Sequence, residues 1–165
     1  MKKPHWVLLL LSALFLSGSD IYEPYSNYKP VFMYRTDMEN AVQLHEARTI
    51  ENPGKIYLKD DYIFVNEKYS GVHIIDNSNP IDPKKIAFMQ IDGCIDMAMK
   101  GNVLYADNAV DLIAVKFSPE YSSAQVTERI REVFPELHAP DGYYLPYEVE
   151  LARPENSIVV KWIKR

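Results

Sequence analysis

Residues 59–66 (KDDYIFVN) and residues 100–107 (KGNVLYAD) follow one pattern, 41 residues apart. Each stretch has a turn pair, then an apolar or aromatic run, then an Asn or Asp. Each leads to a second β-branched run, at 71–75 and 111–115. Asp, Asn and Gly favour the positive φ of two-residue hairpins, so both turn pairs predict β-hairpins. A unit of about 40 to 45 residues with about four strands is typical of a β-propeller blade.

The two copies extend to about residues 54–93 and 94–135. In the first copy, alternation predicts a strand at 55–59, and the apolar run at 86–91 predicts an outer strand. The counterpart at 125–133 is expected to be a strand, although Val126, Ile130 and Val133 also fit helical spacing. The predicted fold is therefore all-β, with two antiparallel propeller-type blades that are too few to close a ring. Such blades leave apolar faces and unpaired edges.

The flanks lack a sustained period. Residues 20–50 are expected to form an extended tether, in which 41–44 opens the first strand or a short helix. Residues 76–83 predict a loop because Asx, Ser and Pro dominate them. Residues 136–165 predict a long Pro/Tyr-rich loop followed by a terminal strand.

Residues 1–19 resemble an export signal. Lys2 and Lys3 precede an apolar run at 6–16, which is too short to span a bilayer and suits a signal-peptide core. Residues 16–19 (LSGS) are similar to a lipobox in which Ser19 replaces the lipidated Cys. The signal is therefore either a lipoprotein signal without its Cys or an ordinary signal cleaved after Ser19. Both predict an extracytoplasmic location in the periplasm, the outer membrane or the cell surface.

Composition narrows the range of partners and cofactors. The formal net charge is −5, which disfavours nucleic acid as a partner. We expect membrane contact only through the N-terminal segment. Cys94 is the single cysteine, and its apolar neighbours predict a buried side chain, not a reactive thiol. Because the sequence has no Gly-rich phosphate loop and no nucleophile elbow, we expect no cofactor.

The segment 71–80 (GVHIIDNSNP), followed by Pro83, resembles the LVIVD repeat of extracytoplasmic bacterial proteins. Residues 54–57, 66–67 and 102–107 are similar to the same family, as are residues 153–156 with Trp162. The second copy is degenerate, since Lys116 stands where Asp is usual. The resemblance covers about residues 30–165 and implies propeller blades in a lipoprotein-like surface protein. It implies no reaction, and this chain departs from the family in length and at Ser19.

We searched the sequence for a reaction site. The four histidines, His5, His45, His73 and His138, do not have the spacing of a zinc site, and residues 76–82 lack the pattern of an EF-hand. Eight aspartates fall near expected strand ends, where they are read as turn formers and solvated edge charges: Asp60, Asp61, Asp76, Asp82, Asp92, Asp96, Asp107 and Asp111. The alternative is a carboxylate pair for glycoside hydrolysis. We assign no catalytic, cofactor-binding or metal-binding residue.

Three tyrosines, Tyr143, Tyr144 and Tyr147, form a possible binding surface, although tyrosines also cover the edges of small domains. The sequence therefore favours a non-enzymatic exported β-repeat protein that self-associates or binds another envelope protein. Two alternatives remain open at this point. One is a carbohydrate-active hydrolase, and the other is a truncated remnant of a longer surface lipoprotein.

Overall fold

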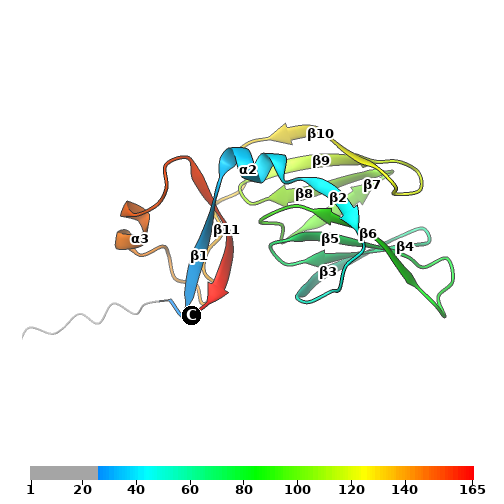
Figure 1. Ribbon diagram of the computed structural model, residues 1–165, viewed down its shortest axis with the longest axis horizontal. Helices are drawn as coiled ribbons and strands as arrows, with labels where there is room; N and C mark the ends of the chain where they lie inside the picture. The colour runs from blue at the N-terminus through cyan, green and yellow to red at the C-terminus, as the bar shows by residue number, and fades with distance from the viewer. Residues whose placement is uncertain (1–25) are drawn as a thin grey trace, which may run out of the picture.

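The computed structural model describes residues 26–165 and shows three antiparallel sheets (Figure 1). The first sheet has the order β2-β6-β5-β4-β3, and the second has the order β10-β9-β8-β7. A third sheet pairs β1 with β11 and lies to one side of the other two (Figure 1). The strands are β1 (Tyr28–Tyr34), β2 (Gln43–Glu46), β3 (Pro53–Lys59), β4 (Tyr62–Glu67), β5 (Gly71–Asp76), β6 (Lys84–Gln90), β7 (Met97–Lys100), β8 (Val103–Asn108), β9 (Asp111–Phe117), β10 (Ala124–Ile130) and β11 (Ser157–Lys164). The helices α2 (Arg35–Asn40) and α3 (Tyr147–Leu151) are short.

Each expected copy of the repeat forms one antiparallel meander, β3 to β6 in the first sheet and β7 to β10 in the second. The two-residue hairpin turns are confirmed between β3 and β4 and between β7 and β8. Asp60 has φ 51° and Gly101 has φ 59°, so the equivalent turn position is left-handed in both copies. The expected all-β antiparallel class is therefore confirmed, with β2 added at the edge of the first meander.

The main core lies between the first and second sheets. Strand alternation turns Phe64, Val72 and Ile74 of the first sheet towards Leu104, Ile113 and Val115 of the second, and all six are fully buried. The edge strands β3 and β7 run side by side, since the Tyr57 hydroxyl donates to the Met99 carbonyl at 3.3 Å. We call the two faces that meet here the inner faces, and the opposite faces the outer faces.

The sequence predicts an extended tether over residues 20–50. The described part of this stretch instead contains two strands, β1 and β2, and the short helix α2. β1 pairs with β11 in a two-stranded sheet, with Tyr28 opposite Lys164. The sequence gives little sign of this strand, since four consecutive residues of β1 are partly buried and no alternation results. Pro30 is tolerated because β1 has a neighbour on one side only.

The C-terminal third adds one short helix to the expected loop and strand. β11 confirms the terminal strand, and β10 confirms that residues 125–130 are extended, not helical. Residues 136–146 contain no helix or strand, as expected for the Pro/Tyr-rich loop, whereas the strand expected to reach residue 133 ends at Ile130. Neither helix within residues 26–165 has the length and apolar character needed to cross a membrane.

Candidate functional site

A groove of about 490 Å³ lies on the outer face of the second sheet. Its floor is formed by β7, β8 and β9, and its wall is the segment 134–138, which we call the strap. The strap is fixed at its far side, because the Trp162 indole donates to the Leu137 carbonyl at 2.8 Å. The lining residues are Ile95, Asp96, Met97, Ala98, Tyr105, Ala106, Asp107, Ala109, Leu112, Phe134, Pro135, Glu136, Leu137 and His138.

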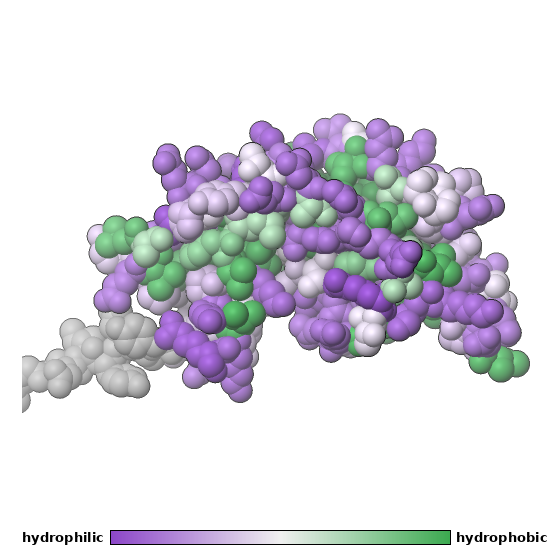
Figure 2. All heavy atoms as spheres, viewed as in Figure 1, coloured by the Kyte–Doolittle hydropathy of each residue, from purple (hydrophilic) through white to green (hydrophobic). Residues whose placement is uncertain are grey.

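The groove presents apolar surface to solvent. Ile95, Tyr105 and Phe134 are each more than a third exposed, which is unusual for large apolar side chains gathered in one hollow. Figure 2 shows hydrophobic residues over both the stacked sheets and the β1–β11 sheet in that view. A concave apolar surface with a few polar groups is the usual form of a binding site.

Three carboxylates line the groove, and each already has partners. Asp96 accepts from the Lys55 ammonium at 2.5 Å and from the Met97 N–H at 2.7 Å. The hydrogen bond from Lys55 lowers the pKa of Asp96 against the effect of burial. Glu136 accepts from the Arg153 guanidinium at 2.6 and 2.9 Å. None of these contacts leaves a free charge directed into the groove.

Asp107 is the third carboxylate and is buried. It accepts from the N–H groups of Ile95 and Asp96 at 2.8 to 3.1 Å. Burial raises the pKa of Asp107 in spite of these donors. The equivalent residue in the first copy, Asn66, donates to the Cys94 carbonyl at 3.3 Å. Both side chains therefore hold the loop between β6 and β7, which indicates a structural role.

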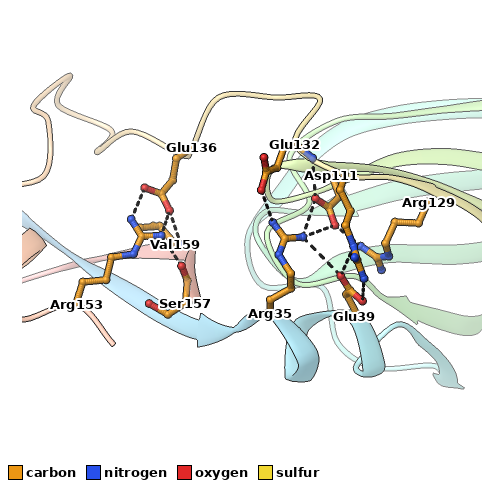
Figure 3. A network of polar contacts seen from close by, with 10 residues as sticks. Arg35, Glu39, Asp111, Arg129, Glu132, Glu136, Arg153, Ser157 and Val159 are labelled. Atoms are coloured by element: carbon orange, nitrogen blue, oxygen red, sulfur yellow. Dashed lines mark hydrogen bonds and ion pairs between the residues drawn. The ribbon is translucent and has the colours of Figure 1, made fainter. Parts of the chain in front are cut away.

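A second polar cluster connects β1 and α2 to the second sheet (Figure 3). The Asp111 carboxylate is fully buried and accepts from Arg35 at 3.0 and 3.1 Å and from Arg129 at 2.8 Å. The Glu132 N–H also donates to it at 3.1 Å. Burial opposes ionisation, but these donors outweigh it and lower the pKa of Asp111. Its partners are all parts of this chain, so the cluster fastens the fold.

A buried Glu67–His73 pair lies on the outer face of the first sheet. His73 Nε2 is 2.9 Å from Glu67 Oε2, and Glu67 also accepts from the N–H groups of Glu51 and Asn52. Burial opposes ionisation of Glu67, yet the His73 contact and these N–H donors lower its pKa. His73 is therefore a fully buried strand histidine whose ring contacts the Glu67 carboxylate.

The expected aspartates do not share one environment. Asp60 and Asp61 occupy a hairpin turn, and Asp76 caps its own loop by accepting from the Ser78 N–H at 2.8 Å. The general interpretation as turn formers and solvated charges is wrong for Asp107 and Asp111, which are buried in strands. The reason is that each satisfies backbone N–H or guanidinium donors from neighbouring segments.

The three tyrosines of the expected binding surface are exposed, but this surface is separate from the groove. Tyr144 and Tyr147 are more than three-quarters exposed, and Tyr143 is more than a third exposed. None of the three lines the groove, but the Tyr144 ring packs edge-to-face against the lining residue His138 with centroids 5.1 Å apart. Ser19 lies outside the described residues.

No protein-family model, curated protein or solved structure matches this chain. Within residues 26–165, no group of three His, Cys, Asp or Glu side chains lies close enough to hold a metal ion. Cys94 is fully buried, and burial together with the charge of Asp107 raises the pKa of its thiol well above the ordinary value.

The sequence does not predict the strap or the groove. Residues 134–138 (FPELH) have neither helical nor strand periodicity, and their contacts with β11 join segments more than twenty residues apart. One signal was available, because Tyr105 alternates with buried neighbours and so had to lie on the face opposite Leu104.

Proposed function

We propose that this chain is a non-enzymatic, exported β-repeat protein that works by assembly through its open sheet faces. The two stacked meanders are interpreted as propeller-type blades. The observation that carries the proposal is the exposure of large apolar side chains on both outer faces. Ile56 and Leu58 of the first sheet are 66% and 69% exposed, and Tyr105 of the second is 39% exposed.

The repeated architecture supports the interpretation as blades. Both meanders have four antiparallel strands and a two-residue turn with a left-handed residue at the equivalent position. Each inner face is buried by the other sheet, whereas the described chain leaves apolar side chains on each outer face uncovered. Covering apolar area of this kind with another protein surface lowers the free energy of the system.

The proposed location outside the cytoplasm rests on residues 1–19, which lie outside the described part. Substituting Lys2 and Lys3 by Glu should hold the protein in the cytoplasm on cell fractionation, because export signals need a basic start. An unchanged distribution between fractions would contradict the export signal.

Light scattering coupled to size-exclusion chromatography tests the assembly proposal. We expect a molar mass above that of one 19.1 kDa chain at micromolar concentration, falling on dilution. A soluble monomer that stays monomeric up to about millimolar concentration would rule out assembly with itself, since a dissociation constant above about 1 mM corresponds to less than about 4 kcal/mol of binding.

The hydrolase alternative has one observation in its favour. Asp96 and Asp107 line the same groove, and their pKa values move in opposite directions, as an acid and base pair requires. Lys55 already neutralises Asp96, and the groove is mainly apolar, which suits a sugar substrate poorly. A panel of nitrophenyl glycosides provides the test. We expect no release of nitrophenol, and release abolished by Asp107→Asn would instead establish the hydrolase.

A further inference from the structure

We propose that copies of this chain associate head to tail. In this arrangement, the outer face of the first sheet in one copy covers the outer face of the second sheet in the next. The inference rests on the proposed function and specifies its surfaces. It continues an interface that the chain already contains, namely the packing of the two inner faces against each other.

The outer face of the second sheet is equivalent to the inner face of the first. Phe64 pairs with Ile74 across β4 and β5, and Tyr105 pairs with Ala114 at the same place across β8 and β9. Phe64 is fully buried beneath the second sheet, whereas Tyr105 remains 39% exposed. The second sheet therefore repeats a face that is buried in the first.

The outer face of the first sheet is likewise equivalent to the inner face of the second. Met97 and Met99 of β7 are 7% and 8% exposed because they pack against the first sheet. Their equivalents in β3 are Ile56 and Leu58, which are 66% and 69% exposed. The apolar character is retained at both positions, but no described segment covers them.

The groove itself follows from one size difference between the copies. Tyr57 pairs with Phe64 in the first sheet, and its equivalent Ala98 pairs with Tyr105 in the second. Tyr57 reaches the Met99 carbonyl of the neighbouring sheet. Because Ala98 is small, the floor of the groove is hollow at this point. A bulky side chain such as Leu58 of a second copy would fill it.

Charge also matches between the two free faces. Lys100 and Lys116 flank Val103 in one row on the outer face of the second sheet, and neither has an ion-pair partner within residues 26–165. β3 and β7 run parallel, since Lys55 contacts Asp96 and Tyr57 contacts Met99. A next copy stacked in the same sense would therefore bring beside these lysines its Asp60-Asp61 turn, in which Asp60 pairs with Lys59. Such pairing fixes the register of an interface more than its affinity.

This contact joins two different surfaces, so it is heterologous and generates a ring or a filament by repetition. That property gives a direct test with two variants. Leu58→Glu blocks the first face and Tyr105→Glu blocks the second, while each variant keeps its other face intact. We expect either variant alone to elute with the mass of one chain. An equimolar mixture should form a complex of two chains, because it contains one intact pair of faces.

Controls separate association from folding. Ile81→Glu changes a loop residue that is 95% exposed and lies outside both faces, so this variant should assemble as the unchanged protein does. Circular dichroism melts must show that each variant is folded. If Tyr105→Glu fails to fold, Ala98→Glu at the groove floor replaces it.

A cross-link provides a second measurement that is independent of any association through residues 1–25. Copies with Leu58→Cys are mixed with copies with Ala98→Cys and treated with a short bis-maleimide, for which the buried Cys94 does not compete. We expect a cross-linked dimer in the mixture only. Two results would overturn the head-to-tail contact while leaving assembly intact. One is a cross-linked dimer formed equally by either cysteine variant alone. The other is a mixture of Leu58→Glu and Tyr105→Glu that forms no complex of two chains. A monomeric unchanged protein overturns both proposals.

Discussion

Replacing Asp111 by Asn removes the negative charge from the cluster that fastens β1 and α2 to the second sheet, at nearly constant volume. The contacts affected are those from Arg35, Arg129 and the Glu132 N–H, since the Asn amide keeps only one uncharged acceptor oxygen. Removing one partner of a buried ion pair costs about 3 to 5 kcal/mol. The side chains of Arg35 and Arg129 are 23% and 14% exposed, so water can solvate part of the positive charge that Asp111 no longer neutralises. We therefore expect a loss of about 3 kcal/mol in the free energy of unfolding.

The assay is chemical and thermal unfolding followed by circular dichroism. For a domain of this size, about 3 kcal/mol corresponds to a fall in Tm of roughly 6 to 12 °C. The matched control is Asp82→Asn, because the Asp82 side chain is 70% exposed and its ion pair with Lys84 is long, at 3.9 Å. We expect the control to change stability by less than about 0.5 kcal/mol.

The pH dependence distinguishes loss of charge from a general packing defect. The folded protein lowers the pKa of Asp111, so its contribution is present above the pKa of the unfolded chain, which is about 3.9 for Asp. That contribution is lost as the pH falls through the lower folded-state pKa. The stability difference between the two proteins should therefore shrink below about pH 4. A difference that stays constant down to pH 2, or one below about 0.5 kcal/mol at pH 7, would refute the reasoning.

Three further outcomes are expected. Gly71→Ala should unfold the protein or cost more than about 2 kcal/mol, since φ is 140° there and an added Cβ would overlap a carbonyl oxygen. Gly101→Ala should cost only about 1 to 2 kcal/mol, because at φ 59° the added Cβ meets open space. Thermal melts measure both changes in stability. Cys94 should resist a thiol reagent in the folded protein and react once denaturant unfolds it, and rapid labelling without denaturant would disprove its burial. Glu67→Gln should cost about 1 to 3 kcal/mol at pH 7, and the difference should shrink as the pH falls through the lowered pKa of Glu67. A pH-independent cost would contradict an ionised Glu67 side chain.

Local signals explain the part of the fold that the sequence predicted correctly. Asp60 and Gly101 tolerate positive φ, and apolar runs follow both turns, so each hairpin is specified within about ten residues. The same pattern recurring 41 residues later fixed the second meander. Alternation also separated inner from outer positions, as with Leu104 and Tyr105.

Long-range pairing explains what the sequence did not show. β1 depends on residues 157–164, and nothing within 28–34 alternates strongly enough to reveal it. The burial of Asp111 depends on Arg35, which is 76 residues away. The groove floor is hollow at Ala98, a small exposed residue at the position equivalent to Tyr57, and this size difference becomes meaningful only when both sheets are aligned.

The pairing of β1 with β11 determines the order in which the chain can fold. The two central sheets consist mainly of consecutive hairpins, which can close soon after each has been synthesised. β1 precedes all of them, yet its register partners, from Lys164 opposite Tyr28 to Ser157 opposite Tyr34, are synthesised after all of them. Val31 and Met33 therefore stay without the core of Ile158 and Val160 until synthesis has passed residue 160. We expect this closure to be the slow step of refolding, because loop-closure entropy opposes it until the central sheets have brought the two strands together.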